Sequence, residues 1–326
     1  LGTLGLGKAF TELQLWAKNL KDRGIILAIC SKNTDSVAKE PFEKHPDMVL
    51  RLDDISVFVA NWENKADNIR YIQKVLNIGF DSMVFLDDNP FERNLVRQEL
   101  PTVTVPELPE DPSDYIPYLQ QFNLFETASY SKLDSDRTKK YQEEAKRAEM
   151  KQSFTSVSDY LTNLNMSAVV GPFDDFNVPR IAQLTQRSNQ FNLRTIRYTE
   201  KDIKDIIASD TVDSLYISLS DKYGDYGLIS LIILEKRAKA YFIDTWIMSC
   251  RVLKRDVEKY VLNIIVAQAR NNDIQTIIGE RIPTKKNVLV ENHYKDLGFI
   301  EKNNLWHLDV EAYDDYETYI TTTDKA

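Results

Sequence analysis

The chain has 326 residues and carries 41 Lys and Arg against 50 Asp and Glu, a formal net charge of −9. With 43% hydrophobic residues, 28% charged residues and only 10 Gly and 11 Pro, the composition excludes collagen-like, disordered and disulfide-stapled chains. At about 150 residues per domain, the length predicts two domains, each large enough to bury its own core.

The first half alternates helices with apolar runs of strand length. A helix is predicted over about 11–23, with Thr11 as its cap and Gly24 as its left-handed end. The later predicted elements are a strand over 25–30, the apolar stretch 48–50, a helix over 64–79 that Gly79 closes, a strand over 82–86, a helix from Pro90 and a strand over 101–105. Because strands and helices alternate, we predict a parallel, doubly wound α/β sheet.

The second half has a different order of predicted helices and strands. A charged helix over 134–153, with Asp134 read as its cap, precedes several adjacent strands, a helix over 257–272 and a short helix closed by Gly298. This order predicts an antiparallel-to-mixed α+β domain. The predicted divisions are a first domain over 1–125, a connecting helical segment over 126–165, a second domain over 166–310 and a flexible tail over 311–326.

Charge and apolar patterning limit the partners. An acidic chain lacks the basic excess that neutralises nucleic-acid phosphates, so no nucleic-acid partner is expected. No apolar run reaches the roughly 18–20 residues that span a bilayer, and no signal-peptide pattern is present, so no membrane partner is expected. The two cysteines give no disulfide framework, and the expected location is cytoplasmic.

Polar residues follow the predicted strands at the places where a doubly wound sheet binds ligands. Ser31 comes directly after a buried strand and offers its hydroxyl and nearby backbone N–H groups to an anion. Lys65 near a helix start offers a positive charge to a phosphoryl oxygen. Asp87 and Asp88 offer hard oxygens to a magnesium ion. Taken singly, the same residues are also read as a helix cap, a surface lysine and a turn.

The order of these residues resembles the second, third and fourth motifs of the haloacid dehalogenase (HAD) superfamily. The chain further resembles the FkbH-like family, in which a HAD domain is joined to an acetyltransferase-like (GNAT-like) domain. The segments that carry this resemblance are AICSKN (28–33), NWENKADNI (61–69), FLDDNPFER (85–93), VPELPEDP (105–112), SNQFNLRT (188–195), YGDYGLIS (223–230) and SCRVLKRDVE (249–258). The resemblance as a whole covers about residues 1–300.

The resemblance implies a magnesium-dependent enzyme acting on a small phosphorylated three-carbon acid such as 1,3-bisphosphoglycerate. It implies that phosphate is released and that the glyceryl group is loaded onto an acyl carrier protein. Ser31 and Lys65 would hold the phosphoryl group and Asp87 with Asp88 the Mg²⁺. The further substrate-binding residues would be Lys32, Asn33, Asn89 and, in the second half, Arg251.

One element of the HAD pattern is not found. The first motif, Asp-x-Asp-x-Thr after an apolar strand, supplies the nucleophile and the general acid/base. Only the letters of Asp134–Thr138 match it, and no buried strand precedes them. In the family this segment precedes the LGTLGLGKAF region, so we expect the nucleophile segment to lie ahead of Leu1.

Cys30 is a candidate acyl carrier. It stands next to Ser31 at the end of a strand, where a thiolate could accept an acyl group and pass it on. The alternative interpretation is a buried strand cysteine.

The second half carries weaker candidates. The stretch 251–256 has no glycine, unlike the usual coenzyme A pyrophosphate loop, and its basic residues Arg251, Lys254 and Arg255 either attract a phosphate or simply begin a helix. Tyr294 is either a general acid or a packed tyrosine. The remaining polar cluster, which either lines a pocket between the two domains or satisfies the backbone of a turn, consists of Asn189, Gln190, Asn192 and Arg194.

Two other functions remain open. One is a plain HAD phosphatase whose second half selects the substrate. The other is a catalytically silent binding module without the nucleophile. No zinc, serine-hydrolase or phosphate-loop motif occurs.

Overall fold

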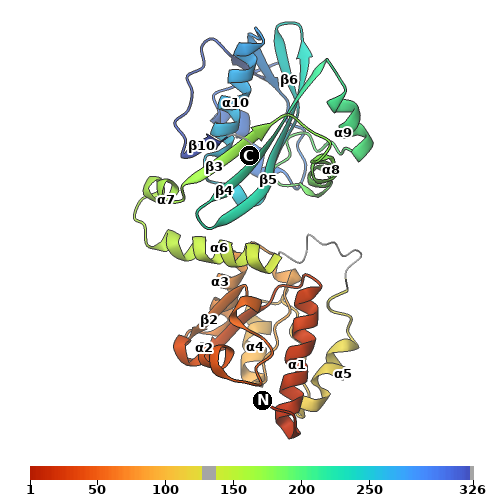
Figure 1. Ribbon diagram of the computed structural model, residues 1–326, viewed down its shortest axis with the longest axis vertical. Coiled ribbons are helices and arrows are strands. Elements are labelled where there is room, and N and C mark those ends of the chain that lie inside the picture. Colours follow the sequence, from red (N-terminus) through yellow and green to blue (C-terminus); the bar gives the residue numbers. More distant parts are fainter. Residues whose placement is uncertain (127–136, 324–326) are drawn as a thin grey trace. The chain divides into compact units, whose positions relative to one another are not determined.

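The computed structural model describes residues 1–126 and 137–323, and the contacts divide it into two compact units, Leu1–Ser153 and Phe154–Ala326. We call these unit 1 and unit 2 and describe each by itself (Figure 1). Asp134, read above as a helix cap, lies outside the described residues. No helix in the described parts of the chain is long and apolar enough to cross a membrane.

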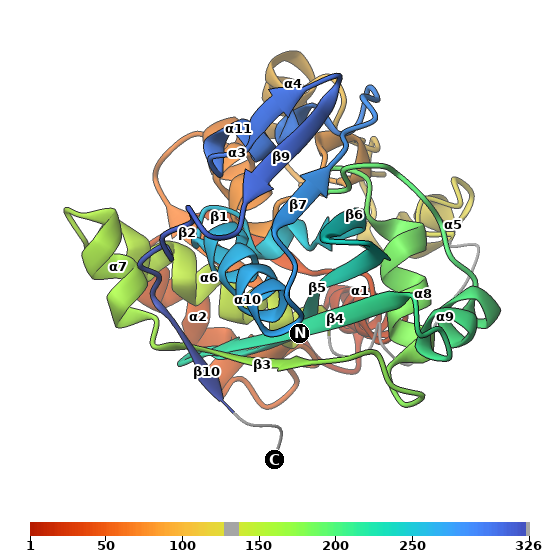
Figure 2. The same cartoon turned by 90° about the horizontal axis from the view of Figure 1, so that it is seen from above.

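Unit 1 is an α/β unit built on two parallel strands. β1 pairs with β2 so that Ser31 stands opposite Ala60 (Figure 2). Its helices and strands are α1 (Gly5–Asp22), β1 (Ala28–Lys32), α2 (Asp35–Lys44), β2 (Val57–Asn61), α3 (Lys65–Leu76), α4 (Pro90–Glu99), α5 (Tyr115–Gln120) and α6 (Arg137–Gln152). Because β1 and β2 run in the same direction, their carboxyl ends meet at one edge.

The parallel sheet is smaller than predicted. The strands expected over 82–86 and 101–105 form a single parallel bridge between Val84 and Thr104. Two backbone hydrogen bonds support the bridge, from the Phe85 N–H to the Thr104 oxygen at 2.9 Å and from the Thr104 N–H to the Met83 oxygen at 3.0 Å. The stretch 48–50 is not a strand; the second strand is β2, which the sequence analysis did not predict.

Two helix ends in unit 1 correct the sequence analysis and one confirms it. α1 begins at Gly5, so Thr11 is not its cap; the Thr11 hydroxyl donates to the Gly7 oxygen at 3.0 Å inside the helix. Gly24 does take the left-handed conformation, at φ 87°. α3 ends at Leu76 with Asn77 left-handed at φ 50°, since Asn tolerates this conformation, and Gly79 follows after the end.

Unit 2 is an α+β unit around one mixed sheet. Among the described residues the sheet has eight strands in the order β10-β3-β4-β5-β6-β7-β9-β8. The strands are β3 (Met166–Gly171), β4 (Val212–Asp221), β5 (Gly224–Arg237), β6 (Ala240–Met248), β7 (Thr276–Gly279), β8 (Ile300–Lys302), β9 (Leu305–Asp309) and β10 (Ile320–Thr323). The helices are α7 (Val157–Asn163), α8 (Val178–Arg187), α9 (Glu200–Ile207), α10 (Val257–Asn271) and α11 (His293–Asp296). The predicted α/β first half and α+β second half are therefore both confirmed.

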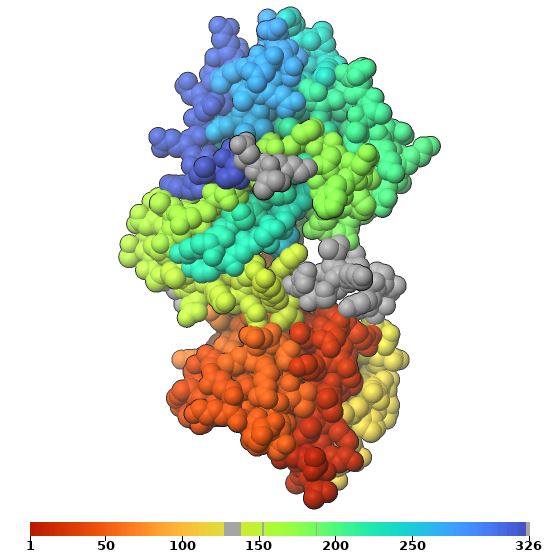
Figure 3. Space-filling view, in the orientation of Figure 1, coloured from red at the N-terminus to blue at the C-terminus, as the bar shows by residue number. Residues whose placement is uncertain are grey.

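Helices cover both faces of the unit 2 sheet. α10 packs on one face through an apolar cluster that includes Val261 and Ile265. α8 and α9 pack on the other face through Ile181 and Ile203, which are fully buried (Figure 1). Figure 3 shows the surface of unit 2 in the same orientation, coloured from green to blue.

The end of the chain differs from the predicted flexible tail. Ile320–Thr323 forms β10, which pairs in parallel with β3 so that Ile320 stands opposite Met166. The Thr-rich stretch suits a strand because Thr is β-branched and fits a pleated edge.

Candidate active site

The carboxyl end of β1 forms the centre of the unit 1 site. The last three residues of β1 are Cys30, Ser31 and Lys32, all partly exposed. Lys65, the first residue of α3, reaches this end, where its Nζ donates to the Cys30 backbone oxygen at 2.6 Å. Asn64 caps α3 by accepting from the Asp67 N–H at 2.8 Å. This cap fixes the start of the helix and therefore the position of Lys65.

Lys65 also meets the aspartate that follows the predicted strand over 82–86. Its Nζ lies 3.0 Å from Asp87 Oδ2, and both side chains are only 9% exposed. The structure thus brings Lys65 and Asp87 together beside Ser31, because the Lys65 amine bonds the carbonyl directly before Ser31. A cation, a hydroxyl and a carboxylate share one edge of the sheet.

The turn that carries Asp87 is held by α4. Asp87 Oδ1 accepts from the Asn89 N–H at 2.9 Å, and Asn89 in turn caps α4 by accepting from the Phe91 N–H. Arg93 donates to the backbone oxygens of Asp87 at 2.8 Å and of Asp88 at 2.9 Å. Arg93 itself pairs with Glu107. Asn89 therefore caps a helix in the structure, and its place as a substrate-binding residue stays a prediction.

Lys32 and Asn33 have partners within unit 1. Lys32 Nζ lies 2.5 Å from Glu92 Oε1, and the Glu92 side chain is 8% exposed. Its other oxygen, Oε2, is buried without a hydrogen bond among the described residues. Asn33 accepts from the next N–H, that of Thr34. Glu92 and Arg93 were not among the predicted site residues. The available signal was their position in the first turn of the helix that begins at Pro90, shortly after Asp87 and Asp88.

The carboxylates fit one of the two ways in which proteins hold magnesium. Among the described residues no three His, Cys, Asp or Glu side chains form a group that could hold a metal ion, so an all-protein cage does not fit. Mg²⁺ is also bound by one or two carboxylates together with water and substrate phosphate. Asp87 has accepting capacity left on each oxygen and Asp88 is exposed, so this pair fits that second mode.

The surroundings of Cys30 favour the protonated thiol over the thiolate. Its side chain packs against the apolar clusters around Phe85 and Val59. Burial raises its pKa to about 11, although the nearby Lys65 charge acts in the opposite direction. Since the thiolate is the nucleophilic form, the packed-cysteine interpretation describes this conformation better than the acyl carrier.

The basic residues of 249–256 lie in unit 2 and make internal contacts. Arg251 donates to the Tyr226 backbone oxygen at 3.1 Å and to Ser249 Oγ at 3.3 Å. Arg255 is 8% exposed and bonds the Tyr226 hydroxyl. In a stretch without glycine, Lys254 and Asp256 take positive φ values of 63° and 58°. Arg251 is therefore tied to its own unit, and its place as a substrate-binding residue stays a prediction.

Tyr294 is packed in the unit 2 core. It is 2% exposed, and a Cβ on Gly279 would collide with its ring. The rings of Trp246 and His293 lie 4.5 Å apart and those of His293 and Tyr294 5.4 Å apart, both edge to face. Burial raises the pKa of Tyr294 far above its usual range. These contacts favour the packed tyrosine over the general acid.

The polar cluster of 189–194 is divided between two roles. Asn192 and Arg194 hold the fold: Arg194 pairs with Asp244 at 2.6 Å and Glu280 at 2.8 Å. Asn189 instead lines a cavity of unit 2 together with Arg197. Arg197 and the other cavity residues were not predicted, because they come from two loops that are distant in sequence.

The unit 1 site has the layout of the HAD phosphotransferase domain that its motifs resemble: a serine, a lysine and an aspartate at the carboxyl ends of parallel strands. Comparison with solved structures finds a similarity to a protein of Bacteroides fragilis, BF1531, whose N-terminal part contains a phosphatase domain and was crystallised in complex with Mg. The identity is 75% over 39% of this chain and 34% of that chain, with a TM-score of 0.39. The match thus spans about a third of that chain.

Acetyltransferases are also among the similar structures. The ribosomal-protein-S18-alanine N-acetyltransferase of Escherichia coli is 11% identical over 44% of this chain and 94% of its own, with a TM-score of 0.35. The spermidine N-acetyltransferase of Vibrio cholerae, solved with CoA and spermine, is 10% identical over 44% of this chain and 96% of its own, also with a TM-score of 0.35. No family model and no curated protein matches the sequence.

Proposed function

We propose that unit 1 is a magnesium-dependent phosphotransferase domain that binds a small phosphorylated carboxylic acid. The observation that carries the proposal is the position of Lys65, whose amine joins the end of β1, at 2.6 Å from the Cys30 oxygen, to Asp87 at 3.0 Å. The description of BF1531 as a phosphatase crystallised with Mg agrees with this function.

Each residue has a distinct task in this proposal. Lys65 neutralises charge on the phosphoryl oxygens, which is worth most in a water-poor site. Ser31 donates its hydroxyl to one of these oxygens. Asp87, with Asp88, holds the Mg²⁺, which supplies further neutralisation of the phosphoryl charge when it is bound. Arg93 orients both aspartates through their backbone oxygens.

The finer part of the proposal concerns the substrate and the acyl group. The motif resemblance supports a phosphorylated three-carbon acid whose glyceryl group passes to an acyl carrier protein. In the first step of this transfer a bond forms between Cys30 Sγ and the acyl carbon while the acyl–phosphate bond breaks, phosphate leaves, and the thiol proton passes to solvent. In the second step the thiol of the carrier binds the acyl carbon, the bond to Cys30 Sγ breaks, and Cys30 takes up a proton. Since the pKa of Cys30 is raised to about 11, its surroundings would have to open first.

Binding of 3-phosphoglycerate to the whole chain, with and without Mg²⁺, tests the proposal. Lys65→Met is expected to weaken binding at least tenfold, because it removes the cation, and Ser31→Ala several-fold. The control is Lys74→Met, an exposed lysine of the same helix α3, which should leave binding unchanged. Hydrogen exchange of β1 and β2 establishes that each variant is folded.

The outcome separates the candidate functions. Equal affinity in Lys65→Met and Lys74→Met would contradict a phosphoryl site at Lys65. Binding without any effect of Mg²⁺ would argue against the metal role of Asp87. If phosphate is released from 1,3-bisphosphoglycerate and the glyceryl group reaches neither the protein nor a carrier, the plain phosphatase replaces the acyl-transfer proposal. If Cys30→Ala transfers the glyceryl group as well as the wild type, the role of Cys30 is contradicted.

A further inference from the structure

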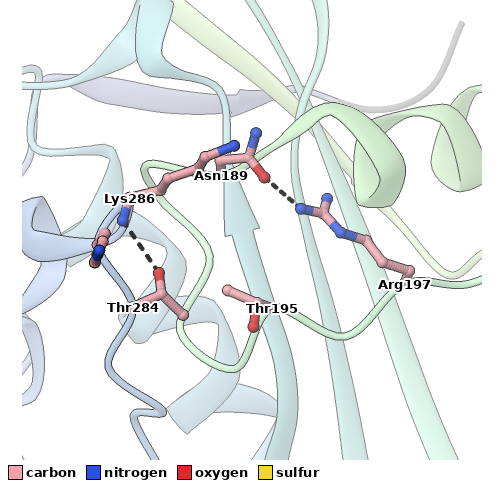
Figure 4. A pocket seen from close by; sticks show the side chains of 6 residues that line it. Asn189, Thr195, Arg197, Thr284 and Lys286 are labelled. Atoms are coloured by element: carbon pink, nitrogen blue, oxygen red, sulfur yellow. Dashed lines mark hydrogen bonds between the residues drawn. The ribbon is translucent and has the colours of Figure 1, made fainter.

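Unit 2 contains a cavity of about 390 Å³ that the proposed function does not use. It lies between two loops, one over 188–197 and one over 284–287, as Figure 4 shows. The residues that line it are Asn189, Thr195, Arg197, Thr284, Lys285 and Lys286. The lining thus consists of cationic, hydroxyl and amide side chains.

The cavity is positively charged although the whole chain has a net charge of −9. Three of the six lining residues are cations and none is acidic. Arg197 has only neutral partners: the Thr185 and Ser188 backbone oxygens and Asn189 Oδ1. Its charge is therefore not neutralised by a carboxylate among the described residues.

The two lysines are available to a ligand. Lys285 and Lys286 are exposed, and neither has an ion pair within the part of the chain that the structure describes. Both stand on the same short loop as Thr284, whose Oγ1 accepts from the Lys286 N–H at 3.3 Å (Figure 4). Lysine ammonium groups bind phosphates as point charges, whereas the planar Arg197 group can offer two parallel donors.

Buried amides hold the walls of the cavity in place. Asn287 is 0% exposed; its Nδ2 donates to the Asn192 oxygen at 3.0 Å, which ties one loop to the other. Its Oδ1 accepts from the Thr284 N–H at 2.7 Å. On the facing loop Asn192 Oδ1 accepts from the Thr195 N–H at 2.7 Å. Because these bonds exist without a ligand, binding would not have to order the two loops.

The lining suits a phosphoryl group better than a carboxylate. A phosphoryl group carries up to two negative charges and three accepting oxygens. A carboxylate carries one charge and two oxygens, too few for three cations and two hydroxyls. We propose that this cavity of unit 2 binds the phosphoryl group of a small molecule, in addition to the phosphoryl site of unit 1.

Lysine reactivity on the whole chain localises this binding, with inorganic pyrophosphate as the probe. At an ionic strength of about 0.15 M, where the Debye length is about 8 Å, pyrophosphate should slow acetylation of Lys285 and Lys286 at least fivefold in a saturable manner. Lys295 and Lys302, exposed lysines of the same unit outside the cavity, should be unaffected. The readout is specific to unit 2, so failure of the unit 1 site does not affect it.

Charge-matched variants complete the test. Lys285→Gln should raise, at least fivefold, the pyrophosphate concentration at which the slowing of Lys286 acetylation reaches half of its full extent. Lys302→Gln should leave this concentration unchanged. An equal shift in both variants would show diffuse attraction and overturn the proposal. So would an absence of saturable protection, or equal protection by acetate at the same concentration, since acetate has no phosphoryl group.

Discussion

In unit 1 a buried cation and a buried anion stand side by side at the sheet edge, Lys65 with Asp87, each only 9% exposed. In unit 2 the rings of three buried residues, Trp246, His293 and Tyr294, are packed edge to face. The first arrangement keeps charge at the edge where a ligand can use it, and it depends on both partners being present. The second arrangement carries no charge of its own, and it depends on shape and on His293 remaining unprotonated.

The largest expected effect comes from breaking the unit 1 pair. Asp87→Leu leaves the Lys65 charge buried without its partner, which costs about 3–5 kcal/mol in the free energy of unfolding. The double variant Lys65→Met/Asp87→Leu should recover most of this loss, because no unpaired charge remains. Denaturant titration followed by hydrogen exchange of β1 and β2 measures unit 1 separately from unit 2.

The exposed pair of Lys44 and Glu40 supplies the control. Their side chains are 71% and 57% exposed, so Lys44→Met should have no measurable effect. A single Asp87→Leu variant as stable as the wild type would show that the unit 1 pair is hydrated, and the contrast between the units would disappear.

A smaller loss in the free energy of unfolding is expected for unit 2 when the pH is lowered. Burial lowers the pKa of His293 to about 3 from 6.5. The unfolded chain therefore takes up a proton that folded unit 2 excludes, so this contribution to stability is complete above about pH 6.5 and is lost as the pH falls toward 3. The expected slope is about 1.4 kcal/mol per pH unit, which amounts to roughly 2–3 kcal/mol between pH 6.5 and 4.5.

Glu258 acts in the opposite direction, since burial raises its pKa. Its stabilising contribution is present at low pH and is lost as the pH rises through its folded pKa. The comparison of wild type with His293→Leu cancels this contribution because Glu258 is present in both. The two proteins should differ in the pH slope of unit 2 unfolding between pH 6.5 and 4.5, and parallel slopes would contradict a buried neutral His293.

The smallest effect tests packing. In Gly279→Ala the new Cβ would collide with the Tyr294 ring, so we expect a loss of about 1–3 kcal/mol from overpacking. Gly171→Ala is the matched control in another strand of the same unit, because its Cβ would lie 3.1 Å from the Tyr216 ring. Thermal unfolding of the two variants should differ, with Gly279→Ala the less stable, and the reverse order would show that the Tyr294 ring moves freely.

The sequence predicted those parts of the molecule that depend on local pattern. The left-handed Gly24 and the helix start at Pro90 were predicted because turn and cap signals lie within a few residues. β2 was missed because its five residues follow a polar stretch and carry only three strongly apolar side chains. The bridge between Val84 and Thr104 replaced two predicted strands, since strand pairing depends on distant residues.

In the candidate sites, too, the residues that could be predicted are those that depend on local sequence pattern. Ser31 and Asp87 were predicted because they end apolar runs, and Lys65 because it stands near a predicted helix start; the structure does bring the lysine to the aspartate. Glu92 was missed because a charged residue in the first turn of a helix is usually exposed. The cavity of Arg197 and Lys286 could not be predicted, because nothing local indicates that two loops separated by α9, α10 and four strands face each other.

The parallel pairing of β10 with β3 means that one edge of the unit 2 sheet stays unpaired until late in synthesis of the chain. β3 leaves the ribosome long before Ile320, at synthesis rates that make the interval on the order of ten seconds. During this interval the outer edge of Met166–Val169 presents unpaired N–H and C=O groups, which can recruit a strand from another nascent chain. The Thr-rich strand Ile320–Thr323 thus covers the edge of β3 late in synthesis. A chain that ends before this strand would keep an unpaired β3 edge, to which strands of other chains can pair.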